Sequence, residues 1–196
     1  MKMDRATLKA NAKAQIKGKI GILFVIYLIM AAIATVVSMI PGVGSLAYAV
    51  VLGPAFSLAV IKIYLGLTCG VEPNIKALFG EFNNFWSAFK VTFLVGLFTY
   101  LWSLLLIIPG IVKGISYSQA LYILAENPEI GAREAINRSK AMMDGHKMEY
   151  FVLNLSFIGW YLLSVITFGI ATIWVIPYIS AACANFYNSI KSPVEV

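Results

Sequence analysis

The stretch that decides the fold is Ile20–Ile40, IGILFVIYLIMAAIATVVSMI, which carries no charged residue. A helix rises 1.5 Å per residue, so about 20 apolar residues cross the roughly 30 Å of hydrocarbon in a bilayer. This stretch therefore predicts a membrane-spanning helix. The whole composition agrees, because 60% of the 196 residues are hydrophobic and 12% are charged, against about 25% charged in a soluble domain.

Five more apolar stretches follow along the chain, and most of their charges lie near their ends. We predict one all-helical integral membrane domain over residues 1–196, with six transmembrane helices. Their approximate ranges are 20–40, 45–67, 89–108, 111–125, 150–168 and 170–187. Tyr64, Trp86, Tyr150 and Tyr187 fall where an aromatic belt at the inner interface is expected.

The charges predict the orientation of these helices. If the N-terminus is cytoplasmic, 14 of the 15 Lys and Arg and all nine Asp and Glu lie on the inner side, and only Lys113 lies outside. Excess Lys and Arg on cytoplasmic loops orients membrane proteins. We therefore predict a multi-pass protein with both termini in the cytoplasm.

The three predicted outer connections resemble one another. They read Ile40-Pro41-Gly42-Val43, Ile108-Pro109-Gly110-Ile111 and Phe168-Gly169-Ile170. Proline and glycine are typical of tight turns. Each connection follows a polar-apolar stretch, at 1–19, 72–88 and 127–147. The pattern predicts three transmembrane hairpins, each preceded by a cytoplasmic amphipathic helix. Chance similarity between short motifs stays open as the alternative.

The first of these stretches is strongly basic. Arg5, Lys9, Lys13 and Lys17 recur every four residues and share one face of a helix, beside an apolar face. Such a helix is typical of contact with anionic lipid. The alternative is that these bases only set the orientation during insertion.

Polar residues and prolines within the spans are the candidate ligand-facing groups. Lys113 and Tyr117 lie four residues apart on one helical face. Pro54 and Pro177 interrupt the second helix of their hairpins, which frees backbone carbonyls, and Asn154 adds an amide. Structural kinks, interhelical hydrogen bonds and a lysine that reaches the surface are the alternatives.

The sequence carries no recognisable catalytic machinery. No span contains Asp, Glu or His, the groups used in proton relays within membranes. His146 has Asp144 and Glu149 nearby, but one histidine and two surface acids fall short of a metal site. We predict no catalytic residue, metal or cofactor. The bases flank apolar spans and form no basic domain, so nucleic acid is not an expected partner.

Several short motifs occur in order along nearly the whole chain, and together they resemble a known family. They are Arg5-x-x-Leu8-Lys9-x-x-Ala12, Leu78-Phe79-Gly80-x-Phe82, Ile108-Pro109-Gly110-Ile111, Ala125-Glu126-Asn127-Pro128, Leu155-Ser156-Phe157-Ile158-Gly159-Trp160, Pro177-Tyr178 and Phe186-Tyr187. The set resembles an uncharacterised family of integral membrane proteins from Gram-positive bacteria, a domain of unknown function. It is distantly similar to the membrane domain of some glycerophosphodiester phosphodiesterases. The resemblance implies a bacterial plasma-membrane location and brings no catalytic residue.

These observations predict a non-enzymatic membrane protein that binds lipid or a membrane partner in envelope processes. The basic helix favours anionic lipid headgroups. The partner could be another membrane protein or a second copy of the chain. Two alternatives stay open: a small permease or transporter subunit, and a protein that gives immunity to a membrane-active peptide.

Overall fold

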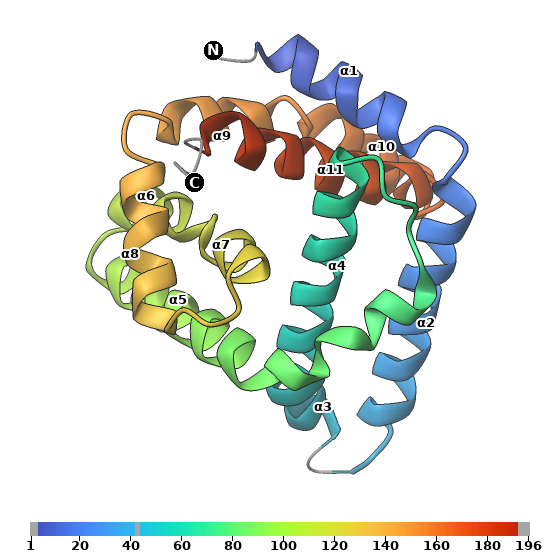
Figure 1. Cartoon of the computed structure of the whole chain (residues 1–196), viewed down its shortest axis with the longest axis horizontal. Coiled ribbons are helices and arrows are strands. Elements are labelled where there is room, and N and C mark those ends of the chain that lie inside the picture. The colour runs from blue at the N-terminus through green and yellow to red at the C-terminus, as the bar shows by residue number, and fades with distance from the viewer. Residues whose placement is uncertain (1–3, 42–43, 192–196) are drawn as a thin grey trace.

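The structure, a computed structural model, describes residues 4–41 and 44–191. Within these residues every regular element is a helix, with no strand (Figure 1). Five segments are long and apolar enough to cross a membrane: Ile20–Ser38, Tyr48–Thr68, Ile75–Leu104, Ile107–Glu126 and Lys147–Ile166. The all-helical prediction is confirmed, and these five segments indicate a membrane protein.

The helices form three groups in Figure 1. In the first group α1 lies over α11. In the second, α2 and α4 run from there toward α3. In the third, α5, α6 and α8 lie on the left of the view. In chain order the elements are α1 (Arg5–Ile16), α2 (Ile20–Ser38), α3 (Gly44–Ala47), η1 (Tyr48–Leu52), α4 (Gly53–Thr68), η2 (Ile75–Leu78), η3 (Gly80–Asn84), α5 (Phe85–Leu105), α6 (Ile107–Tyr117), α7 (Ala120–Glu126), α8 (Ala132–Met142), α9 (Lys147–Leu155), α10 (Ile158–Ile166) and α11 (Thr172–Ile190).

α11 occupies the place of the sixth predicted span, 170–187, but it is not among the five apolar segments. Its C-terminal half carries Asn185 and Asn188, which lower its hydropathy. Every residue from Ala181 to Tyr187 is buried, and the helix packs against α1, α2, α4 and α10. α11 is therefore the core helix of the fold.

Two other predicted spans are broken into two helices each. The segment predicted at 111–125 breaks at Ser118–Gln119, between α6 and α7, and the one at 150–168 breaks at Ser156–Phe157, between α9 and α10. At the first break the Ser139 hydroxyl of α8 accepts from the Gln119 N–H (3.2 Å) and donates to the Ser116 carbonyl (2.8 Å). A side chain from a distant helix thus replaces backbone bonds lost at the break.

The chain reverses between α5 and α6 at Leu106, and not at Pro109-Gly110 as the sequence pattern predicted. Leu106 is extended (φ −159°, ψ 139°), and Pro109 and Gly110 lie in the first turn of α6, where proline is tolerated because no N–H is needed. Gly110 packs against α5: a Cβ there would lie 2.7 Å from the Ser103 Cα. This glycine is needed for close helix packing, and the predicted turn is wrong by three residues.

The prediction of an amphipathic helix at 72–88 is also wrong. This stretch forms two short 3₁₀ helices, η2 and η3, and the start of α5. Ion pairs join it to neighbouring helices, Lys19 Nζ to Glu72 at 2.9 Å and Lys62 Nζ to Glu81 at 2.8 Å. The other stretches do contain a helix, α1 and α8.

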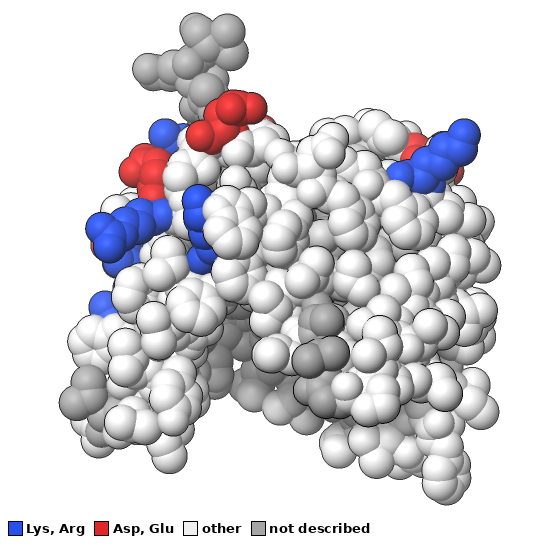
Figure 2. Space-filling model, turned by 90° about the horizontal axis from the view of Figure 1, so that it is seen from below, with Lys and Arg blue, Asp and Glu red and all other residues white. Residues whose placement is uncertain are grey.

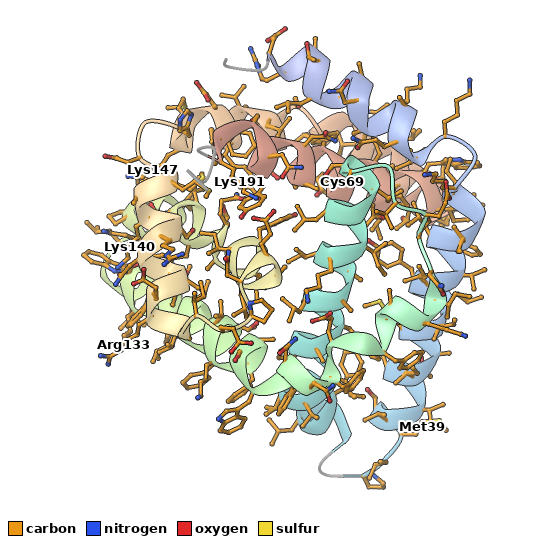
Figure 3. The ribbon with its side chains drawn as sticks, in the orientation of Figure 1. Met39, Cys69, Arg133, Lys140, Lys147 and Lys191 are labelled. Carbon is orange, nitrogen blue, oxygen red and sulfur yellow. The ribbon has the colours of Figure 1, made fainter. Side chains whose placement is uncertain are left out.

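The surface separates charged from apolar regions. Figure 2 shows a face on which the charged side chains lie along the upper margin and down the left side, and the rest of the visible described surface is uncharged. In Figure 3 the labelled Arg133, Lys140 and Lys147 lie on one side of the molecule, and Met39 lies at its far end. Large hydrophobic side chains are exposed at that end and elsewhere, among them Phe168 at 98%.

The predicted aromatic belt is largely wrong. Tyr64 and Tyr187 are 2% and 1% exposed and belong to the core. The Tyr64 hydroxyl accepts from the Tyr27 hydroxyl at 3.3 Å, and Tyr150 packs on Phe186. Trp86 is the exposed member of the four.

Candidate functional site

α1 is docked on the protein through its apolar face. Leu8, Ala12 and Ile16 are buried, and Asp4 caps the helix by accepting from the Arg5 N–H. Spacing of four residues puts these three side chains on one stripe. α11 receives this stripe.

An amide pair joins the same two helices. Gln15 Nε2 donates to Asn185 Oδ1 at 3.1 Å, and Asn185 Nδ2 donates to Gln15 Oε1 at 2.7 Å. Asn185 is 5% exposed, so both its polar atoms require partners. The pair fixes the register of α1 on α11.

Lys9, one of the four predicted lipid contacts, lies against the protein. Its Nζ donates to the Ser156 carbonyl at 3.1 Å and lies 4.4 Å from the centroid of the Phe157 ring. Burial, and then the nearby Arg5 guanidinium, lower the pKa of Lys9. The other three basic residues of α1 are exposed. Arg5 helps to line a small cavity with Asp4, His146 and Glu149.

Lys13 and Lys17 lie at a groove between α1, the start of α2, α10 and α11. The groove has a volume of about 520 Å³, and Ile16, Ile20, Trp160, Trp174 and Tyr178 complete its lining. Cavities of about 300–1,000 Å³ with mostly apolar walls and a few polar groups are typical ligand sites. Neither lysine forms an ion pair with another described residue. The groove combines two ammonium groups with aromatic and aliphatic walls, a chemistry suited to an anionic amphiphile.

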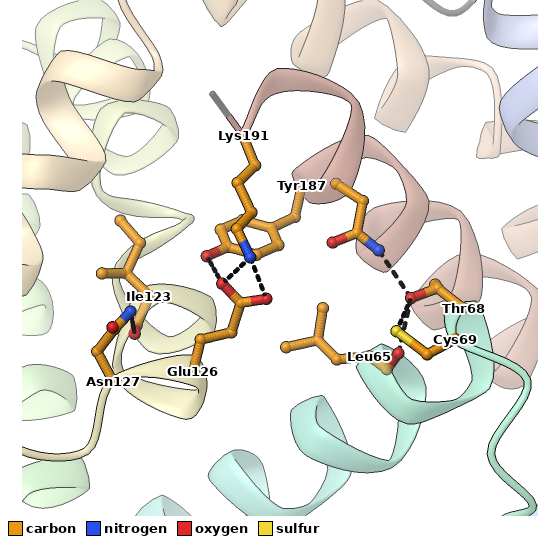
Figure 4. Close-up of polar contacts among 9 residues, drawn as sticks. Leu65, Thr68, Cys69, Ile123, Glu126, Asn127, Tyr187 and Lys191 are labelled. Atoms are coloured by element: carbon orange, nitrogen blue, oxygen red, sulfur yellow. Dashed lines mark hydrogen bonds and ion pairs between the residues drawn. The ribbon is translucent and has the colours of Figure 1, made fainter. Parts of the chain in front are cut away.

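A second cavity, of about 850 Å³, lies between α7, α8 and the end of α11. In its wall Tyr187 donates to Glu126 Oε2 at 2.7 Å, and Lys191 Nζ lies 2.6 Å from the same oxygen (Figure 4). Arg138 and Asp144 also line it, so its charges are mixed. Arg138 is bonded to Glu134 at 2.8 Å. This cavity is polar but has no excess of one charge.

The C-terminal part of α11 holds several helices by polar contacts. Besides the Glu126 contacts to α7, Asn188 donates to the Thr68 hydroxyl at the end of α4 at 2.7 Å (Figure 4). Together with the amide pair to α1, α11 therefore binds three other helices within two turns. Sequence reasoning did not foresee these partners, because they are 61 to 170 residues away along the chain.

The structure does not bring the five predicted ligand-facing residues together. Lys113 Nζ lies over the Trp102 ring at 4.9 Å, and the Tyr117 ring lies beside Phe98 and under Lys140 Nζ at 5.5 Å. Asn154 donates to the Tyr150 carbonyl of its own helix at 2.9 Å.

The two prolines have separate structural places. Pro54 is the second residue of α4 and follows the π-helix η1, so the helix changes from π to α geometry there and continues without a break. Pro177 is buried inside α11, whose helix continues through it. Neither residue lines the groove or the polar cavity, and neither do Lys113, Tyr117 and Asn154.

The aromatic wall of the groove went unrecognised in the sequence. Trp174 and Tyr178 lie four residues apart, a spacing that places them on one helical face. Their meeting with Trp160 and the lysines depends on how α10, α11 and α1 pack. The sequence signal was therefore present but incomplete.

The chain matches one protein family over nearly its whole length. The family described as "Protein of unknown function (DUF975)" matches residues 1–116 and 104–193. The chain belongs to this family. No curated protein and no solved structure matches it. The resemblance of this DUF975 protein to the membrane domain of glycerophosphodiester phosphodiesterases stays a prediction.

Proposed function

We propose that this DUF975 protein is a six-span protein of the bacterial plasma membrane that binds anionic lipid and catalyses no reaction. The observation that carries the proposal is the groove with Lys13 and Lys17 at its edge and Trp160, Trp174 and Tyr178 in its walls. A lipid phosphate would meet the lysines, and an acyl chain would meet the apolar walls. A Lys or Arg near an anionic membrane surface contributes about 1 kcal/mol.

The proposed topology counts α11 as the sixth span. Its flanks support this, because α10 and α11 meet at a turn in which Phe168 and Gly169 have positive φ and no charge lies between Lys147 and Lys191 except Glu149. A helix with a polar, buried face can cross a membrane when protein surrounds that face. Three hairpins then bring both ends of the chain to the cytoplasm.

The lipid-binding test compares two double variants of equal charge. Lys13→Gln/Lys17→Gln should weaken the binding of phosphatidylglycerol by about thirtyfold, since two contacts of about 1 kcal/mol are lost. Lys76→Gln/Lys90→Gln removes the same charge from exposed lysines outside the groove and should change binding less than about threefold. Native mass spectrometry with titrated lipid measures both. Equal losses in the two variants would mean general charge attraction, and the groove proposal would be abandoned.

The topology test uses single cysteines in a chain whose Cys69 and Cys183 are replaced by serine. Ile170→Cys should react with an impermeant thiol reagent in intact cells, and Glu129→Cys only after lysis. Both positions are exposed, so access depends on the membrane. Labelling of Glu129→Cys in intact cells would overturn the proposed orientation.

A further inference from the structure

The break between α9 and α10 leaves a backbone carbonyl that neither helix uses. α9 ends at Leu155 and α10 begins at Ile158, so the Ser156 carbonyl lies between them. The Lys9 ammonium binds it at 3.1 Å. Carbonyls at the C-terminal end of a helix carry partial negative charge and favour cations.

Aromatic rings form the rest of the ammonium environment. The Phe157 ring, which is fully buried, lies 4.4 Å below Lys9 Nζ. Tyr178 packs edge to face on Phe157 at 5.3 Å, and Trp160 packs on Tyr178 at 5.7 Å. An ammonium group over an aromatic face gains most when it is shielded from water. A carbonyl and an aromatic face together select a cationic amine.

This environment adjoins the lysine groove, since Trp160 and Tyr178 also line that groove. An amphiphile in the groove thus has a short route to the break. Lys9, which binds the Ser156 carbonyl at the break, belongs to α1. α1 joins α2 through Gly18, which has a positive φ of 79°. α1 is held by the Leu8, Ala12 and Ile16 stripe, the Gln15–Asn185 pair and Lys9 itself.

We infer that the α9–α10 break is a binding site for a primary ammonium group, with Lys9 of α1 as its built-in occupant. The exogenous ligand is an alkylammonium group, either free or on an aminoethyl lipid headgroup. The site is separate from the phosphate contacts of the proposed function, so one can fail without the other.

The test is chemical rescue of a variant that lacks the built-in ammonium. Lys9→Ala removes a side-chain fragment equivalent to n-propylammonium. Hydrogen exchange of the α1 amides should become at least about fivefold faster in phosphatidylglycerol nanodiscs. Adding n-propylammonium chloride should restore slow exchange in a saturable way, whereas n-propanol should not. Nanodiscs that also contain phosphatidylethanolamine test the headgroup as the source of the ammonium.

Two variants separate this site from a general salt or lipid effect. Lys13→Ala, on the exposed side of the same helix, should show no rescue by the amine. Phe157→Leu, combined with Lys9→Ala, should abolish rescue because the aromatic face is lost. Rescue by either probe supports the site, and the probe that works identifies the source. Absence of saturable rescue by both, or rescue that survives Phe157→Leu, would overturn the inference.

Discussion

The amide pair between Gln15 and Asn185 predicts a specific pattern of stability changes. Gln15→Leu leaves Asn185 Oδ1 without its 3.1 Å partner, while Asn185 Nδ2 keeps the Ala181 carbonyl at 2.8 Å. One buried acceptor without a partner costs about 1–3 kcal/mol. Hydrogen bonds between membrane helices average about 0.6 kcal/mol with a maximum near 1.7. We therefore expect about 1.5 kcal/mol, or roughly a tenfold faster exchange of the α1 amides.

A double-mutant cycle separates this pair from simple loss of packing. Asn185→Leu alone should also release α1. The double variant Gln15→Leu/Asn185→Leu should cost less than the sum of the two single changes, because it leaves no polar atom of the pair without its partner. The expected coupling is about 1 kcal/mol, measured by hydrogen exchange of residues 8–16 with α5 amides as the internal reference. Additive changes, with coupling below about 0.3 kcal/mol, would refute the pair as the contact that fixes α1.

Two further changes test other contacts. Gly110→Ala should destabilise the protein by about 1–3 kcal/mol, because its Cβ would meet Ser103. Gly96→Ala, with nothing within 4 Å of its Cβ, should not lower the thermal midpoint, and equal shifts for the two would contradict the packing argument. Lys191→Met should lower the midpoint by the equivalent of about 1 kcal/mol, since its ion pair is partly buried. Lys147→Met, whose ion pair is longer and more exposed, is the control, and a larger loss there would count against this ranking.

Periodicity along the chain was sufficient to predict two helices, α1 and α2. The charge-free run at 20–40 became α2, and the four-residue spacing of Leu8, Ala12 and Ile16 became the buried stripe of α1. Both follow from the helical repeat and from the removal of apolar surface from water. No distant partner is needed for either.

Features that depend on residues distant in the chain could not be predicted from the sequence. The break at Ser118–Gln119 is stabilised by Ser139, and Lys9 binds at the break after Ser156. Nothing near Ser118 or Ser156 in the sequence distinguishes these serines from those that stay within a helix. The shift of the turn from Pro109 to Leu106 has the same origin, because close packing of Gly110 on α5 requires α6 to begin early.

The polar contacts of α11, the last helix of the chain, with α1, α4 and α7 have a consequence for biogenesis. A ribosome makes the chain from its N-terminus, and earlier segments begin to organise first. Gln15, Thr68 and Glu126 are then all in place before the residues that satisfy them have been translated. Until the final helix arrives, nascent protein must carry Gln15 and Glu126 without these partners, and Thr68 with its hydroxyl bonded to the Leu65 carbonyl of its own helix. A chain that stops short of Asn185 would expose all three at once, and it is such truncated products that membrane proteases should remove fastest.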